Sequence, residues 1–167
     1  AGEGGWVRTG AGGWGLGAGA VGIEDATASS SMASAKRFED LICWQLAAEL
    51  SDLVDEMTSS GPASYDHDLK SQIRKSACKS PAQIAEAYAR WDPADTANML
   101  RIARASLAET QSHLLKGKKR NYWTPEIFDK AWTLSDRAMG ATTNYMKERQ
   151  RTAALEKQRL RTRTKAP

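Results

Sequence analysis

Histidine and cysteine, the side chains that most often carry chemistry, are scarce in this chain of 167 residues. Its two histidines are His67 and His113. Metal sites in helical bundles need a repeated Glu-x-x-His, which places two ligands on one helix face. Here the nearest pair is Glu109 and His113, four residues apart and not repeated. We therefore expect no catalytic residue, no metal site and no cofactor.

The two cysteines, Cys43 and Cys78, stand beside alanines and serines in helical stretches. In such surroundings a cysteine is expected to be a small buried hydrophobe rather than a nucleophile. Two cysteines also cannot form a disulfide framework. No stretch approaches the roughly 20 apolar residues that a membrane helix needs. These observations exclude a secreted mini-protein and a membrane protein, and they favour a cytoplasmic one.

Charge is distributed unevenly along the chain, although the formal total is only +4. Residues 36–58 hold two basic and six acidic side chains, whereas residues 70–120 hold 11 basic and four acidic ones. The last 21 residues, 147–167, hold eight basic and two acidic ones. Since net charge bears on partners and solubility rather than on fold, we expect one basic side and a basic C-terminal tail.

The first 35 residues are rich in Gly, Ala and Ser and have no amphipathic period. Such a segment cannot bury enough apolar surface to offset the entropy lost on ordering, so we predict disorder over residues 1–35. Helical periodicity begins just after Met32. Met32 is therefore the expected natural start, with residues 1–31 an upstream addition; a flexible native arm is the alternative.

Four segments with apolar residues spaced by three and four positions follow this N-terminal region. The predicted helices cover about 36–57, 66–90, 93–116 and 125–146. Short links between them favour an all-α, antiparallel up-down-up-down four-helix bundle. We therefore divide the chain into a disordered segment (1–35), a four-helix bundle (36–146) and a basic tail (147–167).

Capping residues support these boundaries. Asp92-Pro93 and Thr124-Pro125 combine a good N-cap with a proline in the first helical position. Asp66 is a further candidate start. Gly117, among lysines, is predicted to end the third helix, because glycine and cations both suit a helix C-terminus.

Three charged residues are predicted on the inner sides of the second and third helices: Glu86, Arg104 and Glu109. Buried charges must be paired, so we expect these residues to pair within or between subunits and to set the register of the helices. A charged groove for a ligand is the alternative. Trp44 lies off the core stripe of the first helix, and it is expected either to contact a neighbouring subunit or to pack inside the bundle.

Four motifs occur in order: FEDLICWQLA from Phe38, LKSQIRKSA from Leu69, QIAEAYAR from Gln83 and LRIARASLAE from Leu100. With them the chain resembles the four-helix-bundle family encoded in intervening sequences of bacterial large-subunit rRNA genes, often labelled S23-type ribosomal protein. That family is related to the accessory variability protein of diversity-generating retroelements. The resemblance covers roughly residues 37–145.

The sequence departs from the family pattern where Gln83 replaces a usual Asn and where Ala87 and Ala105 replace usual glycines. The resemblance implies a ring-like homopentamer without enzymatic activity. In the retroelement relatives, a positive surface binds nucleic acid and the reverse transcriptase. Carried over to this chain, the resemblance implies structural or oligomer-interface roles for a set of four residues: Trp44, Glu86, Arg104 and Glu109.

The leading hypothesis is therefore a non-catalytic homo-oligomeric protein that binds RNA or DNA by charge. Residues four apart share one helix face, so the basic residues of the second helix are predicted to form a ridge. The alternatives are a solvated face and an adaptor that docks an acidic partner, or a reverse transcriptase, without touching nucleic acid. The candidate phosphate contacts are Lys70, Arg74, Lys75 and Lys79 on the second helix, and Lys118, Lys119 and Arg120 at the end of the third.

Overall fold

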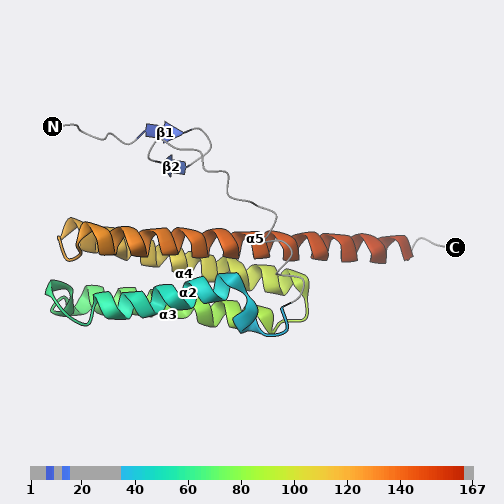
Figure 1. The fold of residues 1–167 in the computed structure, drawn as a ribbon. Helices are drawn as coiled ribbons and strands as arrows, with labels where there is room; N and C mark the ends of the chain where they lie inside the picture. Colours follow the sequence, from blue (N-terminus) through green and yellow to red (C-terminus); the bar gives the residue numbers. More distant parts are fainter. Residues whose placement is uncertain (1–6, 10–12, 16–34, 164–167) are drawn as a thin grey trace.

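The protein is a helical bundle, described by a computed structural model over residues 7–9, 13–15 and 35–163 (Figure 1). The all-α four-helix bundle predicted from the sequence is confirmed. Its elements are η1 (Phe38–Asp40), α2 (Ile42–Met57), η2 (Pro62–Ser64), α3 (His67–Tyr88), α4 (Pro93–Lys119) and α5 (Pro125–Arg163).

A short antiparallel hairpin precedes the bundle, formed by β1 (Val7–Thr9) and β2 (Gly13–Gly15). The sequence analysis did not anticipate these strands. Most of the segment that it predicted to be disordered, and the proposed start at Met32, lie outside the described residues.

Hydrogen bonds between helices show that neighbours run in opposite directions. Ser76 and Gln83 of α3 contact Thr110 and Ser106 of α4, with oxygen–oxygen distances of 3.0 and 2.8 Å, so that advancing along α3 means retreating along α4. Between α4 and α5, Gln111 donates to Asp136 at 2.6 Å, whereas Lys118, later in α4, lies over the ring of Phe128, earlier in α5. α2 packs against both α3 and α5. The arrangement is therefore up-down-up-down.

The core is built mainly from leucine, isoleucine and alanine. Alanines on every helix are fully buried and let the backbones approach closely. Burying one large aliphatic side chain contributes about 2 kcal/mol, and this term drives assembly. The largest fully buried apolar side chains are Leu41, Leu50, Val54, Leu69, Ile73, Ile84, Leu100, Leu107 and Leu114.

The predicted helix starts are confirmed. The Asp92 carboxylate accepts hydrogen bonds from the backbone N–H groups of Ala94 and Asp95 at 2.7 and 2.9 Å. Asp66 caps α3 in the same way through the N–H of Leu69, at 3.1 Å. Each such cap satisfies donors that have no partner within the helix.

Gly117 does not end a helix, contrary to the prediction, because α4 continues to Lys119. The glycine instead provides room for Trp123, which follows the helix. A Cβ at position 117 would lie 2.2 Å from the indole ring. The indole Nε1 donates to the carbonyl of Leu114 at 3.0 Å, which fixes the ring in this place.

The last helix is much longer than predicted. α5 does not stop near Met146 but runs to Arg163. Residues 147–163 contain no Gly or Pro and are mostly Arg, Lys, Gln, Glu, Ala and Leu, which favour helix. The apolar period does fade there, but this indicates loss of packing rather than loss of helix. Residues 147–163 are hereafter the α5 extension.

Candidate nucleic-acid interface

Two of the predicted phosphate contacts on α3, Lys75 and Lys79, form an exposed pair. They lie one helical turn apart. Neither side chain forms an ion pair with any residue that the structure describes. Lys70, two turns before Lys79 on the same helix, is only half-exposed. Lys75 and Lys79 therefore offer two ammonium groups to an anion in solvent.

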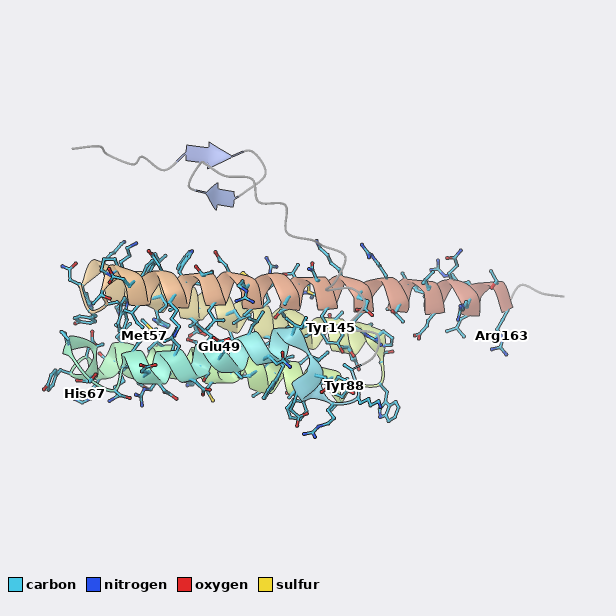
Figure 2. The ribbon with its side chains drawn as sticks, viewed as in Figure 1. Glu49, Met57, His67, Tyr88, Tyr145 and Arg163 are labelled. Carbon is cyan, nitrogen blue, oxygen red and sulfur yellow. The ribbon has the colours of Figure 1, made fainter. Side chains whose placement is uncertain are left out.

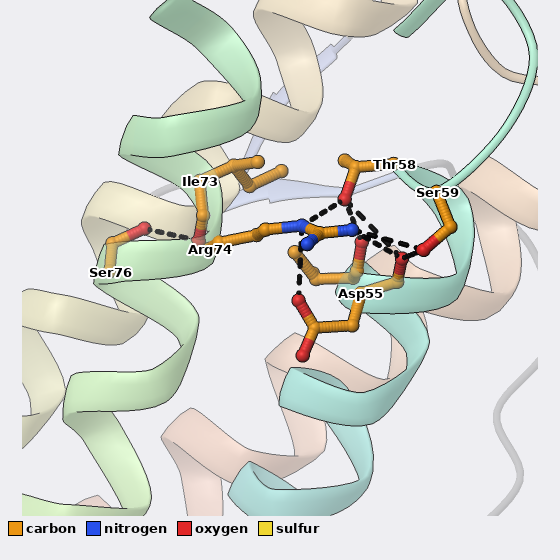
Figure 3. Close-up of polar contacts among 7 residues, drawn as sticks. Asp55, Thr58, Ser59, Ile73, Arg74 and Ser76 are labelled. Carbon is orange, nitrogen blue, oxygen red and sulfur yellow. Dashed lines mark hydrogen bonds and ion pairs between the residues drawn. The ribbon is translucent and has the colours of Figure 1, made fainter. Parts of the chain in front are cut away.

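Arg74 stands next to Lys75 in sequence but faces α2 (Figure 3). Its Nε donates to Thr58 Oγ1 at 2.7 Å, and its Nη2 donates to the carbonyl of Asp55 and the hydroxyl of Ser59, both at 3.0 Å. It also forms an ion pair with the Asp55 carboxylate at 3.1 Å. Arg74 thus holds the C-terminus of α2, where carbonyls lack helical partners. It does not share a face with Lys75 and Lys79.

The cations at the end of α4 are also divided between structural roles and exposure. Arg120 is paired with Asp66, the N-cap of α3, and the hydroxyl of Tyr122 donates to the same carboxylate at 3.2 Å. The pKa of Asp66 is lowered, chiefly by the backbone N–H of Leu69 and also by Tyr122 and Arg120.

Near these residues, Lys118 lies 4.0 Å from the centre of the Phe128 ring, in a cation–π contact. Lys119 is exposed and has no ion pair within the described ranges. Of the three cations predicted to contact phosphate at this end of the bundle, Lys119 is therefore the one without a partner.

The three charged residues expected inside the bundle are exposed, so their predicted placement on the inner sides is wrong. Glu86 pairs with Arg90 one turn later at 2.7 Å, and Glu109 lies 3.8 Å from His113. Arg104 has no ion pair among the residues described. Their alanine neighbours face the core instead, as Ala87 and Ala103 show. Pairing of Glu86, Arg104 and Glu109 between subunits stays a prediction.

Trp44 is half-buried and packs against the core at the start of α2. Its ring meets that of Phe38 edge-on, with centroids 5.2 Å apart. Of the two predicted placements, packing inside the bundle is thus confirmed; a contact with a neighbouring subunit stays a prediction.

The two cysteines differ from each other. Cys43 is buried as expected, and burial raises its thiol pKa to about 12. Cys78 is exposed on α3, so the prediction that both are buried is wrong for this residue.

No three His, Cys, Asp or Glu side chains within the described ranges lie close enough together to hold a metal ion. None of the helices there combines the length and the apolar character needed to cross a membrane. Charge on the helix surfaces is therefore the feature of this site that bears on function.

Sequence comparison identifies the family. A family model described as 23S rRNA-intervening sequence protein matches residues 39–156. The chain belongs to this family. No curated protein matches it closely enough to count as a relative. Membership in the 23S rRNA-intervening sequence protein family accounts for the bundle and for the four motifs. The relation to diversity-generating retroelements stays a prediction.

Sequence reasoning missed the α5 extension as a structured part of the surface. Its cations were assigned to a tail, although part of the extension, up to residue 156, lies inside the matched family region. The signal that could have found it is the uninterrupted run of strong helix formers after Met146.

Proposed function

We propose that this 23S rRNA-intervening sequence protein is a non-catalytic, homo-oligomeric protein that binds RNA or DNA through exposed lysines on α3 and at the end of α4. The observation that carries the proposal is the exposure of Lys75, Lys79 and Lys119 without an ion pair in the described part of the chain. Arg74 and Arg120 support this surface indirectly, because they hold the neighbouring loops.

Contacts of this kind neutralise phosphates and release counterions, so they give affinity with little sequence preference. Two or three lysines in one copy bind weakly. Assembly into the ring expected from the family resemblance would repeat them, and linked sites raise the effective concentration at a long polyanion. The proposed function therefore couples self-association to nucleic-acid binding.

Fluorescence polarisation of a labelled 23S rRNA fragment, titrated with the full chain at 50 and 200 mM salt, tests this function. Replacing both lysines in Lys75→Gln/Lys79→Gln should weaken binding and lower the salt dependence by about one unit of log–log slope per lost contact. The charge-preserving variant Lys75→Arg/Lys79→Arg should bind like the wild type.

Binding that is absent, or that does not change with salt, would overturn the proposal. In that case an acidic protein partner, the adaptor alternative, becomes the explanation for the exposed lysines. Light scattering on the free protein tests the oligomeric part separately, since a monomer at micromolar concentration would contradict it.

A further inference from the structure

The α5 extension is the part of the structure that the proposed function does not use. Figure 1 shows α5 continuing well past the ends of the other helices. In Figure 2, Arg163 lies far beyond Tyr88, which marks the end of α3. Every residue from 154 to 163 is exposed. The extension carries seven basic and two acidic residues.

The cations are arranged on one side of this helix. Spacings of four, three, three and four residues align side chains along a single face, which we call the cationic stripe. All members of the stripe are exposed, and none is acidic. Its members are Lys147, Arg151, Ala154, Lys157 and Arg161.

The acidic residues of the extension lie elsewhere. Glu148 and Glu156 are eight residues apart and therefore share another face. Half-buried Arg149, Thr152 and Ala153 show which side of the extension turns toward the bundle. The stripe thus combines positive charge, exposure and freedom from neighbouring carboxylates on its own face.

The stripe fits a polyanion better than a protein groove or a lipid surface. Those partners need a continuous apolar face, but the exposed leucines of the extension, Leu155 and Leu160, are five residues apart. At 3.6 residues per turn they point about 140° away from each other. They form no seam.

The length of the stripe also suits phosphates. Lys147 and Lys157 are separated by ten residues, or about 15 Å along a helix that rises 1.5 Å per residue. A nucleic-acid duplex carries about one charge per 1.7 Å of its axis. Every cation of the stripe can therefore lie near a phosphate at the same time.

We propose that the α5 extension binds the phosphate backbone of duplex nucleic acid through the cationic stripe. This inference rests on the proposed function and adds to it a second contact surface, separate from Lys75 and Lys79. Binding would also relieve repulsion among the cations of an unsupported helix, so the extension should gain helix content on complex formation.

The test measures polarisation of labelled 20-base-pair RNA and DNA duplexes with full-length Lys147→Gln/Arg151→Gln across 50–200 mM salt. Losing two contacts at about 0.9 slope units each should make the loss of affinity about tenfold larger at 50 mM than at 200 mM salt. The matched control, Arg159→Gln/Arg163→Gln, removes two cations with the same spacing from the opposite face, and it should lose much less. Circular dichroism of each free variant verifies that the helix is retained.

Each outcome has a distinct meaning. Equal losses in the two variants would overturn the stripe and leave only a general effect of net charge. No loss in the stripe variant, with a loss in Lys75→Gln/Lys79→Gln, would overturn this inference and leave the proposed function standing. Failure of the wild type to bind either duplex would contradict both. The RNA and DNA arms show which backbone is preferred.

Discussion

The contact between Gly117 and Trp123 gives the sharpest test of the fold. Adding one methyl group in Gly117→Ala would place a Cβ 2.2 Å from the indole, well inside van der Waals contact, so the ring must move. Forcing extra volume into a packed site costs about 1–3 kcal/mol. Movement of the ring also weakens the Nε1 hydrogen bond to Leu114, a further cost of about 1 kcal/mol. The better helix propensity of alanine returns about 1 kcal/mol.

Gly117→Ala should therefore lower the free energy of unfolding by about 1–3 kcal/mol, the remainder of these three contributions. Gly140, on the exposed face of α5, provides the matched control, since a Cβ there has no neighbour within 4 Å. Gly140→Ala should raise stability by up to about 1 kcal/mol. Urea unfolding of the two variants thus compares one chemical change with opposite expected signs.

A double-mutant cycle assigns the cost to the indole. Trp123→Phe removes the indole atoms that the new Cβ would meet, so Gly117→Ala should be less costly in that background, with a coupling energy of about 1 kcal/mol or more. Stabilisation by Gly117→Ala equal to that by Gly140→Ala, or a coupling energy near zero, would refute the reasoning about close approach.

Three further results are expected. Arg74→Gln should destabilise the protein by about 1–3 kcal/mol, because it leaves the end of α2 without its hydrogen bonds, whereas Lys75→Gln should leave the urea midpoint unchanged and weaken only nucleic-acid binding. The lowered pKa of Asp66 means that its stabilisation is present above about pH 4 and is lost as pH falls through the lower folded value. The difference in urea midpoint between wild type and Asp66→Asn should therefore shrink in acid, and a constant difference would contradict this. A thiol reagent at pH 8 should modify Cys78 at once and Cys43 only after unfolding, because burial raises the Cys43 pKa to about 12; prompt modification of both would contradict the burial of Cys43.

The helices could be predicted because their signals are local. The Asp92-Pro93 start needs only adjacent residues, and the core stripe of each helix needs only a period. The role of Arg74 could not be predicted in this way. Its partners lie 15 to 19 residues away, in a loop whose path depends on how α2 and α3 pack. Spacing placed it on a ridge with Lys70, whereas the structure turns it toward a helix C-terminus.

Gly117 and Glu86 show the same limit from opposite directions. Glycine among lysines is typical of a helix end, and only the position of Trp123 reveals that the glycine is needed for contact instead. Glu86 stands between two alanines, a pattern that indicates close helix packing, yet one alanine, Ala87, takes the buried position while Glu86 faces solvent. A pattern of residue types predicts the face of a helix with an uncertainty of one position, and one position decides burial.

The exposure of Glu86 allows a clean test of assembly. In the isolated chain its one ion pair is with Arg90, a partly exposed i, i+4 pair worth no more than about 0.5 kcal/mol. Glu86→Ala should therefore leave the folded subunit almost as stable as before. If Glu86 also pairs across subunits, as predicted, the same variant should dissociate the oligomer while its helix content persists. Glu56→Ala removes an exposed carboxylate on α2 that has no ion pair among the described residues, and it should change neither property.

Light scattering and circular dichroism on the same samples separate the possible roles of Glu86. Loss of helix together with assembly would indicate that Glu86 stabilises the subunit itself, contrary to its exposure. Retention of the full oligomer would remove Glu86 from the subunit interface. Dissociation with intact helices is the result that only a contact between subunits produces, because the intrachain pair is too weak to matter and the side chain has no place in the core.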